Sequence, residues 1–252
     1  MNLKIATFNI SGGVDNTIIE NDYLDQKAKT AIDDKFLNEI IKMINDEQIE
    51  VMAFQEIITT KDIKYIDSIV SNTDLKFSCY YELSPCNVVE NTNCGLAVLS
   101  KYPIIEETKL KFTNPNLSKT TQSGNTYFSF DKGGLRTKIN INGKYINYIT
   151  LHSFPFRRFN AIPEEHENIF IEFDNFVSNY DNIIVLGDFN AENAIKFLPK
   201  MKENVAVVFD EPTTIDGKKF DNILISKKFN ILDQKLIRSF SDHCACISTI
   251  QI

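Results

Sequence analysis

The sequence has no tryptophan, three histidines and five cysteines in 252 residues. The cysteines are odd in number and show neither the CxxC nor the Cys/His spacing of a zinc site, so we expect reduced thiols rather than a disulfide scaffold. No stretch approaches the ~20 apolar residues of a membrane-spanning helix, and the first residues enter a strand pattern without a signal-peptide core. These absences predict a cytoplasmic protein with no membrane span.

The chain also lacks an excess of positive charge. It has 27 lysines and arginines against 34 acidic residues, which gives a net charge of −7. This balance argues against a non-specific nucleic-acid coat protein and against a binder of anionic membranes. It leaves open an enzyme that acts on phosphates with a divalent cation, because a bound cation changes the local field.

Length and composition are those of an ordinary globular protein, with 43% hydrophobic and 24% charged residues. We find no internal repeat, no low-complexity tract and no linker. The sequence therefore predicts a single domain over residues 1–252, which we expect to be a monomer.

Periodicity predicts a mixed α and β chain. Apolar faces at helical spacing indicate helices over residues 31–45, 60–70, 163–179 and 192–198. Strand patterns occur over residues 3–8, 49–54, 77–83, 95–99, 104–112, 127–130, 135–141, 145–151, 183–186, 205–209, 220–225, 232–238 and 243–250. The polar residues 113–126 are expected to form a mobile loop. Strand-rich stretches between helices favour two packed sheets flanked by helices, a layered α/β sandwich.

The most informative stretch is residues 183–190. Its first four residues are apolar and typical of a strand buried on both faces. Gly187 ends this run, and Asp188 and Asn190 follow with one apolar residue between them. Side chains two residues apart in a strand point the same way. We therefore expect the carboxylate and the amide to emerge together at the end of the strand, where α/β proteins place their chemistry.

Other predicted strands end in residues of the same chemical kind. The full set is Asn9, Glu56, His152, Asp188, Asn190, Asp221, Asn222, Asp242 and His243. All are oxygen donors or imidazoles, which favours a hard cation such as Mg²⁺ or Mn²⁺ over structural zinc. Each residue alone has an ordinary interpretation as a turn former, a helix cap or a structural histidine. Their repetition at the ends or starts of six predicted strands favours one common site.

The ordered set resembles the motifs of the endonuclease/exonuclease/phosphatase superfamily. The matching segments are TFNI (7–10), QE (55–56), GLAVLSKYPI (95–104), LHS (151–153), GDFN (187–190), FDNIL (220–224) and SDH (241–243). They span nearly the whole chain, and GDFN and SDH together in this order are the specific part. The resemblance implies a four-layer αββα sandwich, with two packed mixed β-sheets flanked by helices. It also implies a metal-dependent hydrolase of phosphate esters that uses Mg²⁺ or Mn²⁺.

The resemblance implies a metal site. Glu56 would be the principal metal ligand, with Asn9 beside it and Asp242 contributing. Several branches of the superfamily carry an acidic ligand two residues after the first asparagine, whereas this chain has Ser11 there. This difference favours one metal ion over two.

The resemblance implies catalytic roles as well. Asp188 would orient or deprotonate the attacking water, and Asn190 would hold a phosphate oxygen. His243 would bind the scissile phosphate with Asp221 fixing its tautomer, and His152 would make a further phosphate contact. His152 stands where the abasic-site endonucleases have a tyrosine, which favours the nuclease and phosphatase branches.

Four residues, one of them from the set above, are candidate substrate contacts. Arg157 and Arg158 lie in an aromatic-rich segment just after the 151–153 motif, and Arg136 and Asn222 lie on predicted strands. Arginine pairs well with phosphate, but solvated arginines on a packed loop are an equally good interpretation.

Three functions remain open from the sequence. The first is a Mg²⁺-dependent phosphodiesterase of the nuclease type, acting on nucleic acid or a nucleotide-like diester. The second keeps the site but hydrolyses a phosphomonoester of a small molecule or a lipid head group. The third is a catalytically silent binding module, which the retained Glu56, Asp188 and His243 argue against.

Overall fold

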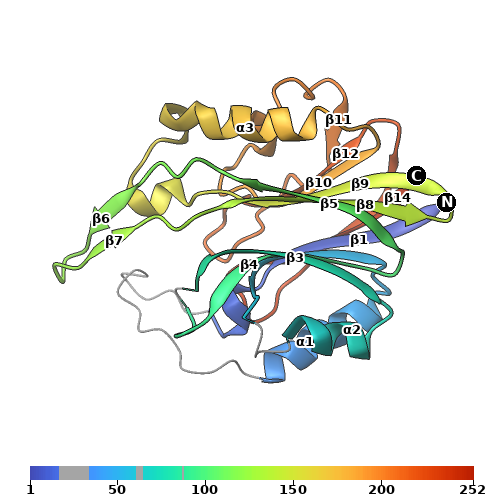
Figure 1. The fold of residues 1–252 in the computed structure, drawn as a ribbon, viewed down its shortest axis with the longest axis horizontal. Coiled ribbons are helices and arrows are strands. Elements are labelled where there is room, and N and C mark those ends of the chain that lie inside the picture. Colours follow the sequence, from blue (N-terminus) through green and yellow to red (C-terminus); the bar gives the residue numbers. More distant parts are fainter. Residues whose placement is uncertain (17–33, 61–64, 87) are drawn as a thin grey trace.

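The structure, a computed structural model, describes residues 1–16, 34–60, 65–86 and 88–252. Two six-stranded sheets lie face to face between layers of helices (Figure 1). Helices α1 (Asp34–Asp46) and α2 (Tyr65–Asn72) cover the outside of one sheet, and α3 (Glu167–Val177) covers the outside of the other. This four-layer arrangement confirms the predicted αββα sandwich.

The first sheet has the strand order β13-β14-β1-β2-β4-β3. Its strands are β1 (Asn2–Asn9), β2 (Val51–Ile58), β3 (Phe77–Pro85), β4 (Asn93–Ser100), β13 (Asn230–Ile237) and β14 (Ala245–Gln251). β1 and β2 are parallel and the other neighbours are antiparallel, so the sheet is mixed.

The second sheet has the strand order β11-β12-β10-β9-β8-β5. Its strands are β5 (Ile104–Lys111), β8 (Gly133–Ile141), β9 (Lys144–His152), β10 (Ile183–Asp188), β11 (Val205–Val207) and β12 (Asp221–Ser226). Here β9 and β10 are the parallel pair. Each sheet thus sends the carboxyl ends of two parallel strands to one edge.

Three apolar clusters hold the layers together. The largest lies between the sheets and includes Leu3, Val98 and Leu186, all fully buried. A second joins α3 to its sheet through residues such as Phe173, and a third joins α1 and α2 to theirs through residues such as Ile40. Burial of one such side chain stabilises the fold by about 1.5–3 kcal/mol, so packing between layers fixes the position of the strand ends.

Two predicted elements differ from the structure. The loop predicted over residues 113–126 is wrong, because it contains β6 (Ser118–Thr120), which pairs with β7 (Thr126–Phe128) as a two-stranded arm. β7 itself overlaps the strand predicted over residues 127–130. The helix expected over residues 192–198 is a short 3₁₀ turn, Ala194–Phe197. The starts expected for the first two helices, residues 31–33 and 61–64, lie outside the described residues. Within the described ranges, no helix has the length and apolar character that crossing a bilayer requires.

Candidate active site

Strand register brings three of the predicted residues side by side in the second sheet. Asp188, the last residue of β10, lies opposite His152 at the end of β9. It also lies opposite Asp221, which begins β12 on the other side. All three side chains are at least 95% buried. Residues more than thirty positions apart in sequence therefore meet at one edge, because β10 is the central strand of the three.

The first sheet supplies the other half of the cluster. The Asn9 Nδ2 atom, at the end of β1, donates a hydrogen bond of 3.0 Å to Asp188 Oδ2. His243, just before β14, places its Nε2 atom 3.9 Å from the same Asp188 oxygen. The residues collected at this edge from both sheets form the candidate active site. The sequence predicted that these side chains meet, and the structure brings them together.

A buried polar contact between the sheets lies directly beneath the site. Gln55, next to Asn9 in the β1–β2 register, donates from Nε2 to Thr7 Oγ1 (2.9 Å) and to Thr150 Oγ1 (2.8 Å). Thr7 lies in the first sheet and Thr150 in the second. Because a buried amide without partners is costly, this bridge fixes the spacing of the sheets where it matters for the site.

His243 and Asp221 form a hydrogen-bonded pair. His243 Nδ1 lies 2.8 Å from Asp221 Oδ2, which also accepts a 2.9 Å hydrogen bond from the Thr213 hydroxyl. Burial alone would lower the pKa of His243, but the charges of Asp221, Asp242 and Asp188 together raise it well above the usual imidazole value. His243 is therefore an imidazolium at neutral pH, with its Nε2–H available at the cluster.

Asp188 is a second buried carboxylate that faces this imidazolium. Burial raises its pKa to about 6, opposed by the His243 charge and by hydrogen bonds from the Asn190 backbone and from Asn9. Asn190 donates to Asp188 from its backbone N (2.8 Å) and from its side-chain Nδ2 (3.2 Å). A carboxylate with a pKa near the working pH is suited to accept a proton from water.

His152 has a different environment from His243. Burial, followed by the charges of Lys132, His243 and Arg158, holds the pKa of His152 well below its ordinary value. Its Nε2 lies 3.4 Å from Asp188 Oδ2 and 3.6 Å from Glu56 Oε1. The two histidines of the site thus differ in charge at neutral pH, which gives them different chemical capacities.

Lys132 is a site residue that sequence reasoning missed. Its Nζ lies 3.1 Å and 3.0 Å from the two ring nitrogens of His152. The cause is the register of β8, because Gly133 pairs with His152 and carries the preceding lysine to the site. A lysine before two glycines is a weak sequence signal, and the strand pairing that makes it meaningful cannot be seen without the structure.

A β-bulge directs Glu56 toward the site. The β2–β4 register shifts between Gln55 and Ile57, so Glu56 is the extra residue, and its φ is +54°. Positive φ is uncommon for a residue with a side chain and is found at functional sites. Opposite the bulge, Gly95 approaches so closely that a Cβ there would lie 1.9 Å from the Tyr81 carbonyl oxygen. The bulge aims the Glu56 carboxylate at His152, and Gly95 allows β3 to pack closely against β4.

Asp242 is held by residues near the start of the chain. Its Oδ1 accepts hydrogen bonds from the Ser11 hydroxyl (2.6 Å) and from Asn16 Nδ2 (3.0 Å). Its Oδ2 lies 3.6 Å from Arg158 NH2 and 3.9 Å from His243 Nε2. Burial would raise the pKa of Asp242, but the His243 charge, the Ser11 hydrogen bond and Arg158 keep it below its usual value.

The donor set of the site fits a hard divalent cation. It contains four carboxylates and two amides and no thiolate, and such oxygen donors suit Mg²⁺ or Mn²⁺. Asp188, Asp221 and His243 offer ligand atoms within 4.8 Å of one another. However, His243 Nδ1 already shares a 2.8 Å hydrogen bond with Asp221, which a cation there would break. Glu56 is 15% exposed and has its 3.6 Å contact with His152, so its carboxylate is the better candidate.

Two predicted substrate contacts are corrected by the structure. Arg136 packs away from the cluster, donating to Asn147 Oδ1 (2.9 and 2.7 Å) and to Glu106 (3.1 Å) and stacking 4.0 Å from the Tyr180 ring. Asn222 bonds the backbone of Phe209 through both ends of its amide. Both side chains therefore have their hydrogen-bond partners within the fold.

The adjacent arginines of the predicted contact loop differ from each other. Arg158 lies beside Asp242 and therefore at the site. Arg157 is 63% exposed and pairs with Asp216 at 3.1 Å. Its role in substrate binding stays a prediction.

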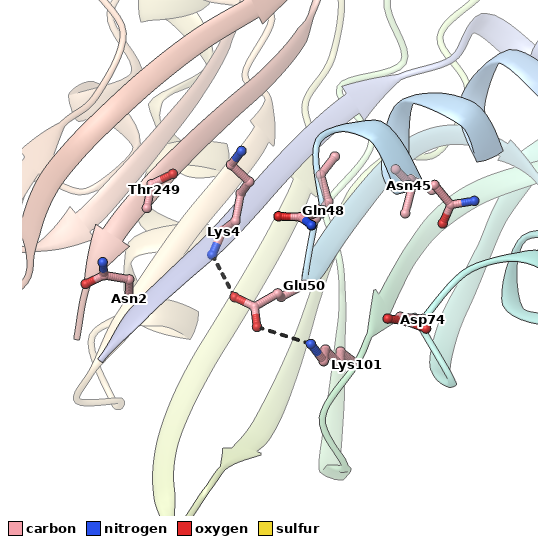
Figure 2. Close-up of a pocket in the computed structure, with 10 residues that line it drawn as sticks. Asn2, Lys4, Asn45, Gln48, Glu50, Asp74, Lys101 and Thr249 are labelled. Carbon is pink, nitrogen blue, oxygen red and sulfur yellow. Dashed lines mark hydrogen bonds and ion pairs between the residues drawn. The ribbon is translucent and has the colours of Figure 1, made fainter.

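A separate hollow lies at the other end of the first sheet. Figure 2 shows Asn2, Lys4 and Thr249 along one side of it and Glu50 and Lys101 near its centre. Lys4 is five residues before the end of β1, so the hollow is about 16 Å from the candidate active site. Glu50 accepts hydrogen bonds from the Lys4 backbone N (3.1 Å) and the Tyr102 hydroxyl (2.6 Å). Its carboxylate is therefore satisfied within the fold.

Comparisons with known proteins agree with this geometry. The sequence model of the Endonuclease/Exonuclease/phosphatase family matches residues 6–243. No curated protein matches the chain significantly.

Three solved structures illustrate the structural similarity. An endonuclease/exonuclease/phosphatase from Beutenbergia cavernae is 13% identical with a TM-score of 0.73, over 100% of this chain and 72% of that one. TDP2 of D. rerio, complexed with a single-strand DNA product, is 15% identical with a TM-score of 0.64, over 100% and 99%. The mannosyl-6-phosphatase Bt3783 of Bacteroides thetaiotaomicron is 11% identical with a TM-score of 0.63, over 99% and 100%.

Proposed function

The chain belongs to the endonuclease/exonuclease/phosphatase family, whose members hydrolyse phosphate esters, and we propose that its substrate is a phosphodiester of the nuclease type, cleaved with Mg²⁺ or Mn²⁺. The observation that carries this proposal is the pairing of a carboxylate and an imidazolium, Asp188 and His243, 3.9 Å apart in a buried cluster. Such a pair supplies a proton acceptor and a proton donor to one phosphate.

We assign the proton transfers to these two residues. Asp188, with a pKa of about 6, accepts a proton from the attacking water, and the amides of Asn9 and Asn190 hold its oxygens in place. His243 donates a hydrogen bond from Nε2 to the scissile phosphate and gives this proton to the leaving oxygen as the bond between that oxygen and phosphorus breaks. Asp221 holds Nδ1 of that ring, which fixes the proton-bearing nitrogen that faces the substrate.

We propose that Glu56 holds the cation, with Asn9 and Asp242 as further oxygen donors. The bulge that aims Glu56 into the site and the oxygen-rich donor set support this assignment. When bound, such an ion neutralises phosphate oxygens and lowers the pKa of water beside it.

Three further side chains would hold the phosphate oxygens. Lys132 is a point charge at the site edge, and Arg158 lies beside Asp242. His152, whose low pKa keeps it neutral, can donate a hydrogen bond without adding charge. Two cations and a neutral donor around one phosphate stabilise the charge that develops in the transition state.

The finer choice of substrate is part of the proposal. Among the structural neighbours, D. rerio TDP2 is complexed with a single-strand DNA product, whereas Bt3783 is a mannosyl-6-phosphatase. Both ester types therefore belong in the test. The diester is favoured by the exposed aromatic rings on the arm of β6 and β7, whose base adjoins the site.

The test is hydrolysis of bis-nitrophenyl phosphate, with nitrophenyl phosphate as the monoester. We expect activity with Mg²⁺ or Mn²⁺, its loss in EDTA, and a higher kcat/KM for the diester. Asp188→Ala and His243→Ala should each lower kcat at least about 100-fold, because each removes one acid–base partner.

Matched controls separate chemistry from folding. His166 stacks on the Phe156 ring, 5.2 Å between centroids, and Asp233 lies on the exposed strand β13. His166→Ala and Asp233→Ala should keep full activity, and circular dichroism should be the same for all four variants. Full activity of Asp188→Ala and His243→Ala would refute the proposed site, and a preference for the monoester would select the phosphatase alternative.

We also propose that residues 1–252 act as one domain, as a cytoplasmic monomer. All five cysteines are buried free thiols, as expected in a reducing compartment. Size-exclusion chromatography with light scattering measures the oligomeric state directly.

A further inference from the structure

The arm formed by β6 and β7 projects from the sandwich beyond the ends of both sheets (Figure 1). It belongs to the segment that leaves β5 at Lys111 and re-enters the second sheet at Gly133. Since Lys132 immediately precedes Gly133 and contacts His152, the base of the arm adjoins the candidate active site.

One side of the returning half of the arm carries exposed aromatic rings. Phe128 is 63% exposed and Phe130 is 43% exposed, while Ser129 between them is buried. In extended backbone, alternate residues share a side. Thr126, which is also exposed, precedes the two rings at the same spacing, and Lys132 follows them. This aromatic stripe, Thr126-Phe128-Phe130-Lys132, leads from the outer end of the arm to the site.

The opposite side of the same segment is anchored. Asn114 donates from Nδ2 to the Ser129 carbonyl oxygen (3.0 Å) and to Asp131 Oδ1 (3.1 Å). The Ser129 hydroxyl donates to Asn114 Oδ1 at 2.8 Å, and Asp131 pairs with Lys111 at 2.6 Å. The rings are therefore presented on a backbone whose position is set before any ligand binds, which reduces the entropy cost of binding.

We propose that the aromatic stripe binds a single-stranded nucleic acid and feeds it to the candidate active site, an inference that rests on the proposed function. Rings two residues apart are about 6.6 Å apart along an extended chain, which allows successive unstacked bases to lie on successive rings. Base–aromatic stacking is how proteins hold single strands without sequence preference. At the end of the stripe, Lys132 supplies a positive charge where a phosphate enters the site.

A lipid surface is the rival occupant, and the sequence of the arm argues against it. The tip, residues 122–125, is Gln-Ser-Gly-Asn and exposed, whereas an arm that inserts into a bilayer needs apolar residues at its tip. The rings lie instead along the half that returns to the site. The Thr120 and Thr126 hydroxyls, 2.9 Å apart on the same face, add hydrogen-bonding groups that suit a polar polymer.

The test measures binding and cleavage separately. Binding of a fluorescein-labelled 12-nucleotide oligothymidylate is followed by anisotropy in Mg²⁺ buffer, in an Asp188→Ala background so that the strand stays intact. We expect F128A/F130A to raise Kd at least about tenfold. In the wild-type background, the same pair should lower kcat/KM for the oligonucleotide at least about tenfold relative to that for bis-nitrophenyl phosphate.

Conservative variants distinguish stacking from apolar burial. F128Y/F130Y keeps the aromatic faces and should bind like the parent, whereas F128L/F130L keeps apolar area without them and should bind like the alanine pair. The control is Phe77→Ala, which removes a 40% exposed ring from β3 in the other sheet and should change neither measurement.

Each outcome has one meaning. Equal Kd for the parent and F128A/F130A, or no oligonucleotide binding by the parent, overturns the proposal. Binding to phosphatidylserine vesicles that the alanine pair loses and the leucine pair keeps, without an effect on the oligonucleotide, would assign the arm to lipid and also overturn it. If the rings govern oligonucleotide binding but the wild-type protein hydrolyses no ester, the proposed binding role of the arm is supported and the proposed function is refuted.

Discussion

Replacing Asp188 by asparagine should remove a pH-dependent cost to folding. Asp188 is buried beside Asp221, and burial raises its pKa to about 6 from an ordinary value of 3.8. The protonated carboxyl is therefore favoured in the folded protein relative to the unfolded chain. Stability from this group is fully present below pH 4 and is lost as the pH rises to about 6.

The magnitude follows from the size of the shift. About two pKa units, at 1.36 kcal/mol each, correspond to about 3 kcal/mol of unfolding free energy. His243 stays protonated in both folded and unfolded states below pH 6, so its own titration lies outside this window. The asparagine also changes the hydrogen bonds with Asn9 and Asn190, but that change is a constant offset and leaves the pH slope unaffected.

The assay is urea unfolding of the wild-type protein and Asp188→Asn in EDTA, at intervals from pH 4 to pH 6. The unfolding free energy of the wild-type protein should fall relative to that of the variant by about 2 kcal/mol across this range, because the group is already partly deprotonated in the unfolded chain at pH 4 and still half protonated in the folded protein at pH 6. Asp233→Asn, on an exposed strand, serves as the control and should follow the wild-type curve. Parallel curves for the wild-type protein and Asp188→Asn would show that Asp188 is not destabilised by burial, and the acid–base assignment would lose its basis.

Three further predictions concern the frame around the site. Gly187→Ala should lower the unfolding free energy by at least about 2 kcal/mol and reduce activity. The reason is that φ is +138° there and a Cβ would lie 2.2 Å from the Leu151 carbonyl oxygen. Wild-type values in urea unfolding and in hydrolysis would contradict this prediction. Arg136→Met should destabilise the fold by about 1–3 kcal/mol, because the contacts to Asn147 and Tyr180 are lost, and it should leave KM unchanged. A tenfold rise in KM would show instead that Arg136 contacts the substrate. Lys132→Gln should raise the pKa of His152, because the substitution removes a positive charge from beside the ring. NMR titration measures this pKa, with His166 as the internal reference. An unchanged pKa would show that Lys132 does not lie beside His152 in solution.

Much of the site could be predicted from where strands end. Apolar runs locate strand ends well, and Asn9, His152, Asp188 and Asp221 lie at the ends or starts of strands as expected. Asp188 and Asn190 do meet, although through a turn with φ +49° at Asn190 rather than through strand spacing.

The side of a sheet was harder to predict than its strands. Neighbours in a strand face opposite ways, so Asp221 faces the site while Asn222 faces Phe209 on the other side. Arg136 fails for the same reason, because its strand turns it toward Tyr180. Lys132 could not be identified as a site residue from the sequence, because its position depends on the pairing of Gly133 with His152. Local sequence does not encode this long-range register. The three-residue strand β6 is too short for periodicity to reveal it, whereas β7 overlaps the strand predicted over residues 127–130.

The division of the site between two sheets has a consequence for timing during synthesis. Asp242 and His243 follow every other site residue in the sequence and lead into β14, which must insert between β13 and β1. A nascent chain that has already released Asp188 and Asp221 from the ribosome still lacks the imidazolium and one whole neighbour of β1. The proposed proton donor is therefore the last part of the site to be synthesised, and a partly made chain carries Glu56, Asp188 and Asp221 without it.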